Sequence, residues 1–228
     1  MSSRVAELIV AFDLPGGREA LALAARLPGL RWAKIGPVLY TREGPAIVRE
    51  FIARGVSVFL DLKWHDIPSV VAEAVAAAAE QGVAMATVHT LGGPAMLAAA
   101  SGAAGNVALI GVTILTSHDT AEVERVLGRG VPDLGFEAER LARLAVEARL
   151  RGVVASGREL ALLRAALGPD LWIVVPGIRG PGDSTADQRR TVTPADAVRL
   201  GATHLVVGRQ VTRAGDPSGV YQRLVESL

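Results

Sequence analysis

Two lysines stand out in this chain because arginine supplies every other strongly basic side chain. Among 24 lysines and arginines, Lys34 and Lys63 are the lysines, and each lies in a short apolar run. An arginine side chain stays charged over the accessible pH range, whereas a lysine can release a proton. Lys34 and Lys63 are therefore candidates for chemistry that moves a proton.

Carboxylates flank the second lysine. Asp61 lies two residues before Lys63 in a run that predicts a strand, and Asp66 follows three residues after Lys63. Alternation along a strand places Asp61 and Lys63 on one face. An ammonium between carboxylates keeps its proton, because the opposite charges outweigh the cost of burial. We therefore expect Lys63 to act as an acid and not as a Schiff-base nucleophile; the alternative is a buried structural ion-pair network.

Composition limits the classes of protein that fit. The 228 residues are 50% hydrophobic, enough for the core of one large α/β domain, and we expect a single domain over residues 1–228. The net charge of +1 and the aromatic content of 4% argue against a nucleic-acid partner. No apolar run approaches the length of a membrane span, and no cysteine is present for disulfides or thiolate metal sites. We expect a cytoplasmic protein without a membrane partner.

Short apolar or β-branched runs recur along the chain, with helical segments between most of them. The runs cover residues 8–13, 32–36, 58–62, 85–89, 108–113, 152–155, 172–176 and 204–208. Helical spacing is clear in residues 18–26, 45–54, 69–81 and 137–150. This alternation predicts an α/β fold, a (β/α)₈ TIM barrel, in preference to a doubly wound sheet.

Polar side chains gather at the predicted carboxyl ends of these strands, the face where barrel enzymes place their catalytic groups. They include Asp13, Lys34, Asp61 and His89. A metal site would need about three converging ligands, and Asp13, Asp61 and His89 are the plausible set. Because the four histidines of the chain are scattered, we favour structural roles for them and predict no metal.

Two loops are candidates for binding an anion. Residues 177–193 form a long connection after the seventh predicted strand, contain Arg179 and Gln188, and are typical of a lid. Gly208 and Arg209 end the eighth predicted strand, where barrels commonly bind phosphate on backbone N–H groups. The alternative for the long loop is a solvated connector with ordinary surface arginines.

Several segments together resemble one known family. Residues 61–68, Asp-Leu-Lys-Trp-His-Asp-Ile-Pro, resemble the Asp-x-Lys-x-x-Asp signature of the orotidine 5′-monophosphate (OMP) decarboxylase family. Further likenesses follow in the family's order at residues 11–13, 34–36, 112–117, 176–179, 187–189 and 207–209. The resemblance implies decarboxylation of OMP to uridine 5′-monophosphate (UMP) and CO₂, without a cofactor, in a homodimer whose subunits share active sites.

The resemblance also implies a role for each matching residue. The catalytic group comprises Lys63 as proton donor to C6 of the pyrimidine, with Asp61, Asp66 and Lys34 in the charged network. The substrate-binding residues it implies are Asp13, Lys34, Asp61, Ile67, Pro68, Thr116, Arg179, Gln188, Gly208 and Arg209. The chain departs from the pattern at Val70, where many members carry threonine, and at Trp64, which is bulkier than expected and should pack outside the barrel.

Two other functions remain open from the sequence. Related barrels that use the same Asp-x-Lys-x-x-Asp motif bind Mg²⁺ and act on sugar phosphates, such as keto-gulonate phosphate decarboxylase and hexulose phosphate synthase. The Pro-Gly-Ile-Arg and Asp-Gln-Arg segments weigh against those relatives. A catalytically silent nucleotide-binding barrel is the second alternative, and an assay of UMP formation separates it from an enzyme.

Overall fold

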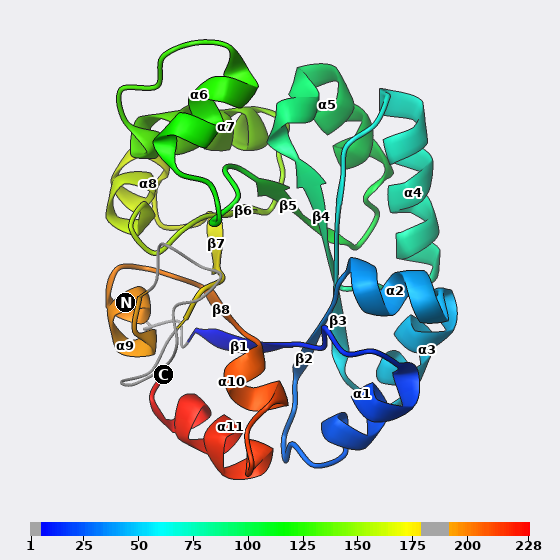
Figure 1. Ribbon diagram of the computed structural model, residues 1–228. Coiled ribbons are helices and arrows are strands. Elements are labelled where there is room, and N and C mark those ends of the chain that lie inside the picture. The colour runs from blue at the N-terminus through cyan, green and yellow to red at the C-terminus, as the bar shows by residue number, and fades with distance from the viewer. Residues whose placement is uncertain (1–5, 179–191) are drawn as a thin grey trace.

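Eight parallel strands form a closed barrel in the computed structural model, which describes residues 6–178 and 192–228. Each strand pairs with the next along the chain, and β8 pairs with β1 to close the ring (Figure 1). The strands are β1 (Glu7–Ala11), β2 (Trp32–Ile35), β3 (Ser57–Trp64), β4 (Met85–His89), β5 (Ala108–Val112), β6 (Gly152–Val154), β7 (Trp172–Val175) and β8 (His204–Val207).

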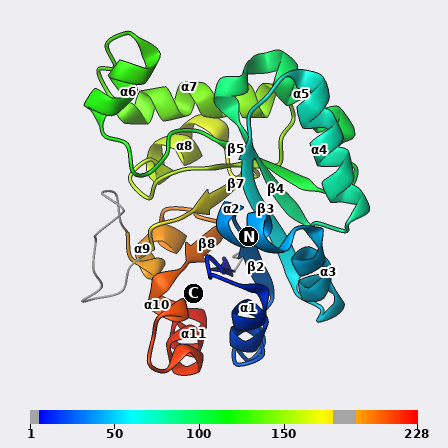
Figure 2. The ribbon, with the colours of Figure 1, turned by 45° about the vertical axis from the view of Figure 1, so that its right-hand side comes forward.

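Helices surround this ring on its outer side (Figures 1 and 2). They are α1 (Gly17–Ala24), α2 (Pro37–Glu43), α3 (Pro45–Ala53), α4 (Pro68–Glu80), α5 (Gly93–Ala103), α6 (Thr120–Leu127), α7 (Leu134–Glu147), α8 (Leu160–Leu167), α9 (Pro194–Arg199), α10 (Arg209–Thr212) and α11 (Pro217–Glu226), with a 3₁₀ turn η1 (Thr90–Gly92). The predicted (β/α)₈ barrel is confirmed.

Alternation along the strands divides the core into two layers. A small cluster fills the barrel interior, and its fully buried members come from different strands: Ile9, Phe59, Met85, Ile110 and Val174. The intervening strand residues belong to a larger cluster, which they form with the inner faces of the surrounding helices. Because both faces of each strand are covered, the strands read as near-continuous apolar runs in the sequence.

Proline marks the start of several helices. Pro37, Pro45 and Pro68 each occupy the first turn of their helices, where the missing N–H has no intrahelical partner to lose. Helix α4 begins at Pro68, one residue before the helical run 69–81 predicted from the sequence. This fixes the turn between β3 and α4, which carries Asp66.

Strand β3 is longer than the predicted 58–62 and is irregular near its end. Leu60 pairs with Ala86 of β4, but the next paired residue is Trp64, which lies opposite Val88. Three residues of β3 therefore lie opposite one residue of β4, which makes a β-bulge. Within it Lys63 has φ of 53°, in the left-handed region that non-glycine residues rarely adopt. Trp64 packs against the outer cluster, as expected from the sequence.

None of the helices in the described ranges is both long and apolar enough to cross a membrane.

Candidate active site

A cavity of about 500 Å³ opens at the carboxyl ends of the strands. Its size falls within the range of small-molecule sites. Seven residues that the sequence singled out line it: Asp13, Lys34, Asp61, Lys63, Thr116, Gly208 and Arg209. The cavity therefore collects the polar strand ends that the sequence predicted would meet on this face.

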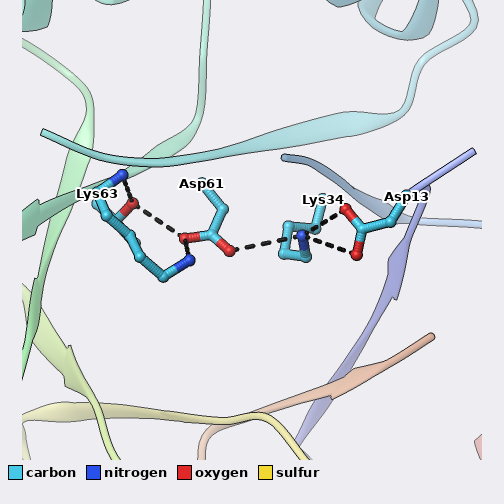
Figure 3. A network of polar contacts seen from close by, with 5 residues as sticks. Asp13, Lys34, Asp61 and Lys63 are labelled. Carbon is cyan, nitrogen blue, oxygen red and sulfur yellow. Dashed lines mark hydrogen bonds and ion pairs between the residues drawn. The ribbon is translucent and has the colours of Figure 1, made fainter. Parts of the chain in front are cut away.

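Four charged side chains form a row of alternating sign along one wall (Figure 3). Nζ of Lys63 lies 2.9 Å from Oδ1 of Asp61, and the other oxygen of Asp61 lies 3.5 Å from Nζ of Lys34. Lys34 in turn donates to Asp13 at 3.1 Å. The row begins at β3, crosses β2 and ends just after β1. Each ammonium has a carboxylate beside it, so the row is electrically balanced within the site.

Burial differs strongly along this row. The side chains of Asp61 and Lys34 are 11% and 10% exposed, whereas those of Lys63 and Asp13 are 35% and 52% exposed. The central pair is thus shielded from water, and Lys63 reaches from it toward the open cavity. An ammonium at that place can contact a ligand without losing its carboxylate partner.

The glycine after β2 allows the Lys34–Asp13 contact. A Cβ at Gly36 would lie 2.6 Å from Oδ1 of Asp13 and 2.9 Å from Nζ of Lys34. Both distances are shorter than a carbon atom tolerates. Any larger residue at position 36 would displace the ion pair.

Asp61 is held as a carboxylate. Burial alone would raise its pKa, but the charges of Lys34 and Lys63, with hydrogen bonds from Lys63 and Thr87, lower the pKa below its usual value. The Thr87 hydroxyl donates to Oδ1 of Asp61 at 3.0 Å. At neutral pH the site therefore contains a fixed negative charge beside the ammonium of Lys63.

The histidines near the site have structural contacts. The rings of His65 and His89 stack with centroids 5.5 Å apart, and Nδ1 of His89 accepts a hydrogen bond from the N–H of Leu91 at 3.3 Å. Burial, together with the neighbouring His65, Lys63 and His118, lowers the pKa of His89 to about 4. Among the residues that the structure describes, no three acidic or histidine side chains gather into a metal site, so Asp13, Asp61 and His89 do not form the triad considered from the sequence.

Three predicted site residues lie outside the cavity of their own chain. Asp66, Ile67 and Pro68 do not line it and are exposed at the start of α4. The Asp66 carboxylate accepts a hydrogen bond from the N–H of Ile67 at 2.7 Å. The roles that the resemblance implies for these three residues stay predictions.

The predicted anion-binding residues line the cavity beside the Asp13 end of the charged row, because β8 pairs with β1. Gly208 and Arg209 follow β8 and line the cavity together with Thr116 from the loop after β5. Two further predicted residues, Arg179 and Gln188, lie outside the described residues. Their roles stay predictions.

Two residues of the site were not singled out from the sequence. Thr87 lies midway along β4 and is fully buried, and its signal was its alternation with Met85 and His89 in the run 85–89. Arg213 lines the cavity one helical turn after Arg209. The spacing of four residues between these two arginines was the signal for the second one.

Comparison with known proteins agrees with this geometry. The model of the orotidine 5′-phosphate decarboxylase / HUMPS family matches residues 6–224. The orotidine 5′-phosphate decarboxylase of Opitutus terrae is 47% identical over 97% of this chain and 98% of that protein, and its Alkalilimnicola ehrlichii counterpart is 48% identical over 97% and 95%.

A solved structure is similar as well. The crystal structure of orotidine 5′-phosphate decarboxylase from Lactobacillus acidophilus superposes with a TM-score of 0.87 at 30% identity, covering 98% of this chain and 99% of that one. The resemblance inferred from residues 61–68 and the other segments is thereby confirmed. The chain belongs to the orotidine 5′-phosphate decarboxylase / HUMPS family.

Proposed function

We propose that the protein decarboxylates OMP to UMP and CO₂, the step that completes UMP synthesis. The observation that carries this proposal is the ammonium of Lys63, which faces the cavity while paired at 2.9 Å with a buried carboxylate. Near-full-length identity of 47% to a protein named for this activity supports it. A row of balanced charges at the carboxyl face of a barrel provides the preorganised electrostatics that the reaction needs.

The reaction leaves an electron pair at C6 of the pyrimidine when the bond to the carboxylate carbon breaks and CO₂ departs. No ring position conventionally delocalises this pair. In our proposal the Lys63 ammonium stabilises the developing charge and then transfers its proton to C6, which gives UMP. The proton on Lys63 is replaced from solvent, to which its side chain is 35% exposed.

The remaining residues position the substrate in this proposal. Asp61 lies beside the departing carboxylate and keeps Lys63 oriented, and Lys34 with Asp13 contacts the ribose. Arg209 and the backbone at Gly208 bind the phosphate, with Arg179 and Gln188 as further predicted contacts. Thr116 contacts the pyrimidine. Binding energy from the phosphate, remote from the reacting carbon, is then available to hold the pyrimidine against Lys63.

We further propose that the protein acts as a homodimer in the cytoplasm. Asp66 is exposed and does not line its own cavity, and beside it Ile67 and Val70 expose 61% and 47% of their surface. Exposed apolar side chains next to a residue needed in the site are suited to an interface between two copies. The absence of cysteine agrees with a reducing compartment.

A Mg²⁺-dependent reaction on a sugar phosphate is the competing function. The family named above includes more than one kind of protein, so the family match alone does not choose between them. Charge argues for OMP: the carboxylate of Asp61 contacts both lysine ammonium groups, which leaves it poorly placed to bind a cation.

One assay tests the proposal. After exhaustive EDTA treatment the protein is incubated with OMP, and UMP formation is followed by chromatography, with a sugar-phosphate substrate and added Mg²⁺ in parallel. We expect UMP formation at an undiminished rate. Turnover of the sugar phosphate alone, restored by Mg²⁺, would replace this function with the competing one. Tight UMP binding without UMP formation would indicate a silent nucleotide-binding barrel.

A further inference from the structure

The bulge in β3 leaves a backbone donor without its usual partner. Along β3 the backbone groups alternate between the two neighbouring strands: the N–H of Ser57 donates to the carbonyl of Arg31, just before β2, and the carbonyl of Val58 accepts from the N–H of Ala84, just before β4. In a regular strand the N–H of Lys63 would therefore point toward β2, whose pairing with β3 ends at Leu60. The step from Leu60–Ala86 to Trp64–Val88 breaks this pattern across Asp61, Leu62 and Lys63. The N–H of Lys63 is therefore outside the ladder, in a residue whose φ of 53° is costly by itself.

A side chain replaces the missing backbone acceptor. The N–H of Lys63 donates to Oγ1 of Thr87 at 2.8 Å. Thr87 is the single residue of β4 opposite the bulge, and it is fully buried. Its hydroxyl donates in turn to Oδ1 of Asp61 at 3.0 Å, the oxygen that also receives Nζ of Lys63 at 2.9 Å. The contacts form a closed ring that ties both ends of Lys63 to one threonine and one aspartate.

We propose that Thr87 is a positioning residue for proton transfer, whose hydroxyl fixes the bulged backbone of Lys63 relative to the carboxylate of Asp61. The proposal rests on the function assigned above to Lys63 and Asp61. Thr87 is not among the cavity-lining residues, so it acts through these two and not by contact with the ligand. Serine would preserve the ring of contacts, whereas valine, with nearly the same shape, would remove both hydrogen bonds.

A purely structural role is the alternative, and the chain offers a matched control for it. Thr90 is also fully buried, and its hydroxyl donates to the carbonyl of Val112 at 2.7 Å. This hydrogen bond involves none of the four side chains of the charged row. Thr90→Val therefore removes a comparable buried hydrogen bond, and with it comparable stability, without disturbing Lys63 or Asp61.

The experiment compares Thr87→Val, Thr87→Ser and Thr90→Val with the wild-type protein. We expect Thr87→Val to reduce kcat for UMP formation by roughly 10- to 100-fold, because a misplaced proton donor slows a reaction steeply. Its affinity for UMP should change little. Thr87→Ser should keep kcat within about threefold, since it retains both hydrogen bonds. Thr90→Val should lower the melting temperature but leave kcat unchanged.

The pH dependence of kcat distinguishes the two roles, because a loss of stability alone would not shift it. The hydrogen bond from Thr87 contributes to the lowered pKa of Asp61. The charged groups facing Asp61 are Lys34 from β2 and Lys63 from β3, and both remain in Thr87→Val. Removing the hydroxyl should therefore raise the pKa of Asp61 and shift the acid limb of the kcat profile to higher pH. In Thr90→Val the acid limb of the kcat profile should lie at the same pH as in the wild-type protein.

The outcomes separate this proposal from the function it rests on. A wild-type protein that forms no UMP refutes the function itself. An active wild type with Thr87→Val equal to Thr90→Val in kcat and pH profile refutes the role of Thr87. If Thr87→Val does not fold, Thr87→Ala takes its place, since alanine and serine differ by the hydroxyl alone. Equal kcat of Thr87→Ala and Thr87→Ser then overturns the proposal.

Discussion

At the scale of single residues, Lys63 combines an unfavourable backbone with a favourable side-chain contact. Its φ of 53° is one of two positive values among the described non-glycine residues, the other being Arg149. Such a conformation persists where the surroundings enforce it, and it is frequent at functional sites. Thr87 contacts the backbone of Lys63 and Asp61 contacts its ammonium, so at this position the unfavourable backbone belongs to the residue with the proposed chemistry.

Replacement of Lys63 by arginine tests whether a transferable proton is required. Charge is retained, so the fold and the binding of UMP should persist. The guanidinium does not release a proton at accessible pH, and its planar shape does not fit the place of an ammonium. We expect kcat for UMP formation to fall by roughly 10²- to 10⁴-fold, the usual contribution of a general acid. Near-normal turnover by Lys63→Arg would show that Lys63 supplies charge alone.

The charged row could be predicted from the sequence, whereas Thr87, which supports it, could not. Lys34, Asp61 and Lys63 were identified from residue type and from alternation, which needs no knowledge of the neighbouring strand. Thr87 matters because β3 and β4 are out of register beside it. Pairing between strands is a long-range property, and it cannot be read from either strand separately. The two-residue periodicity also gave the correct face for Lys63 without anticipating the left-handed backbone that orients it.

At the scale of elements, the loops after the strands divide the cavity between two tasks. The ends of β1, β2 and β3 carry the charged row, and the turn between β8 and α10, next to β1, carries Gly208 and Arg209. The sequence predicted both groups, because the polar residues at strand ends share one face in any barrel. It could not show that Asp66 does not line the cavity of its own chain, since that depends on the course of the turn before α4.

Arg209→Ala tests the assignment of the phosphate to the β8–α10 turn. Loss of a charged contact should weaken UMP binding by about 1.5–3 kcal/mol. Uridine, which lacks the phosphate, should bind the variant and the wild type alike. Titration calorimetry with both ligands measures the difference. Arg199→Ala serves as control, since Arg199 pairs with Asp196 on α9 and should leave both affinities unchanged. Equal losses for UMP and uridine in Arg209→Ala would refute the assignment.

A buried ion-pair group at the start of α7 predicts a pH effect on stability. Glu137 is 5% exposed at its side chain and lies 2.6 Å from both Arg129 and Arg140. The hydrogen bond from Arg140 lowers the pKa of Glu137, burial opposes this shift, and Arg129 adds to it. Because the folded pKa lies below the unfolded one, near 4.5, the contribution to stability is present above that value and is lost as pH falls through the folded pKa.

We therefore expect Glu137→Gln to lower the free energy of unfolding at neutral pH by about 1–2 kcal/mol, since the arginines are half exposed. Its deficit relative to the wild type should shrink as the solution is acidified. Urea unfolding at several pH values measures both quantities. Glu50→Gln removes an exposed ion pair with Arg54 and should have little effect at any pH. A deficit that grows toward acid would contradict the sign derived for Glu137.

At the scale of the whole molecule, the described barrel does not bring Asp66, a predicted site residue, to its own cavity. Asp66 lies on the surface with the exposed Ile67 beside it. If two copies associate through this surface, each can supply the carboxylate that the other lacks. A symmetric pair then has two sites, each built from both chains.

The dimer is tested by placing a charge in the proposed interface. We expect the wild-type protein to sediment as a dimer and Ile67→Asp to sediment as an inactive monomer, because burying a carboxylate in an apolar contact is costly. Val126→Asp is the matched control: Val126 is 66% exposed on α6, a helix separated from α4 by α5 (Figure 1), and the variant should stay dimeric and active. A fully active monomer, of either the wild type or Ile67→Asp, would refute the shared site.

Mixing two inactive variants tests the sharing directly. A dimer of one Lys63→Arg chain and one Asp66→Asn chain contains one site with both native residues and one site with neither. Equal amounts that exchange freely should recover about a quarter of wild-type activity, since half of the dimers are mixed and each has one intact site. No recovery after confirmed subunit exchange would place each site within one chain.

The pairing of β1 with β8 also determines when this protein can fold during synthesis. Glu7 to Val10 lie beside His204 to Val207, so the ring joins segments from opposite ends of the chain. Until β8 leaves the ribosome, β1 and β7 both retain open edges, which can pair with other chains. Asp13, after β1, and Arg209, after β8, likewise come to line one cavity only at that moment. The nascent chain is therefore both inactive and prone to aggregation until its last strand is complete.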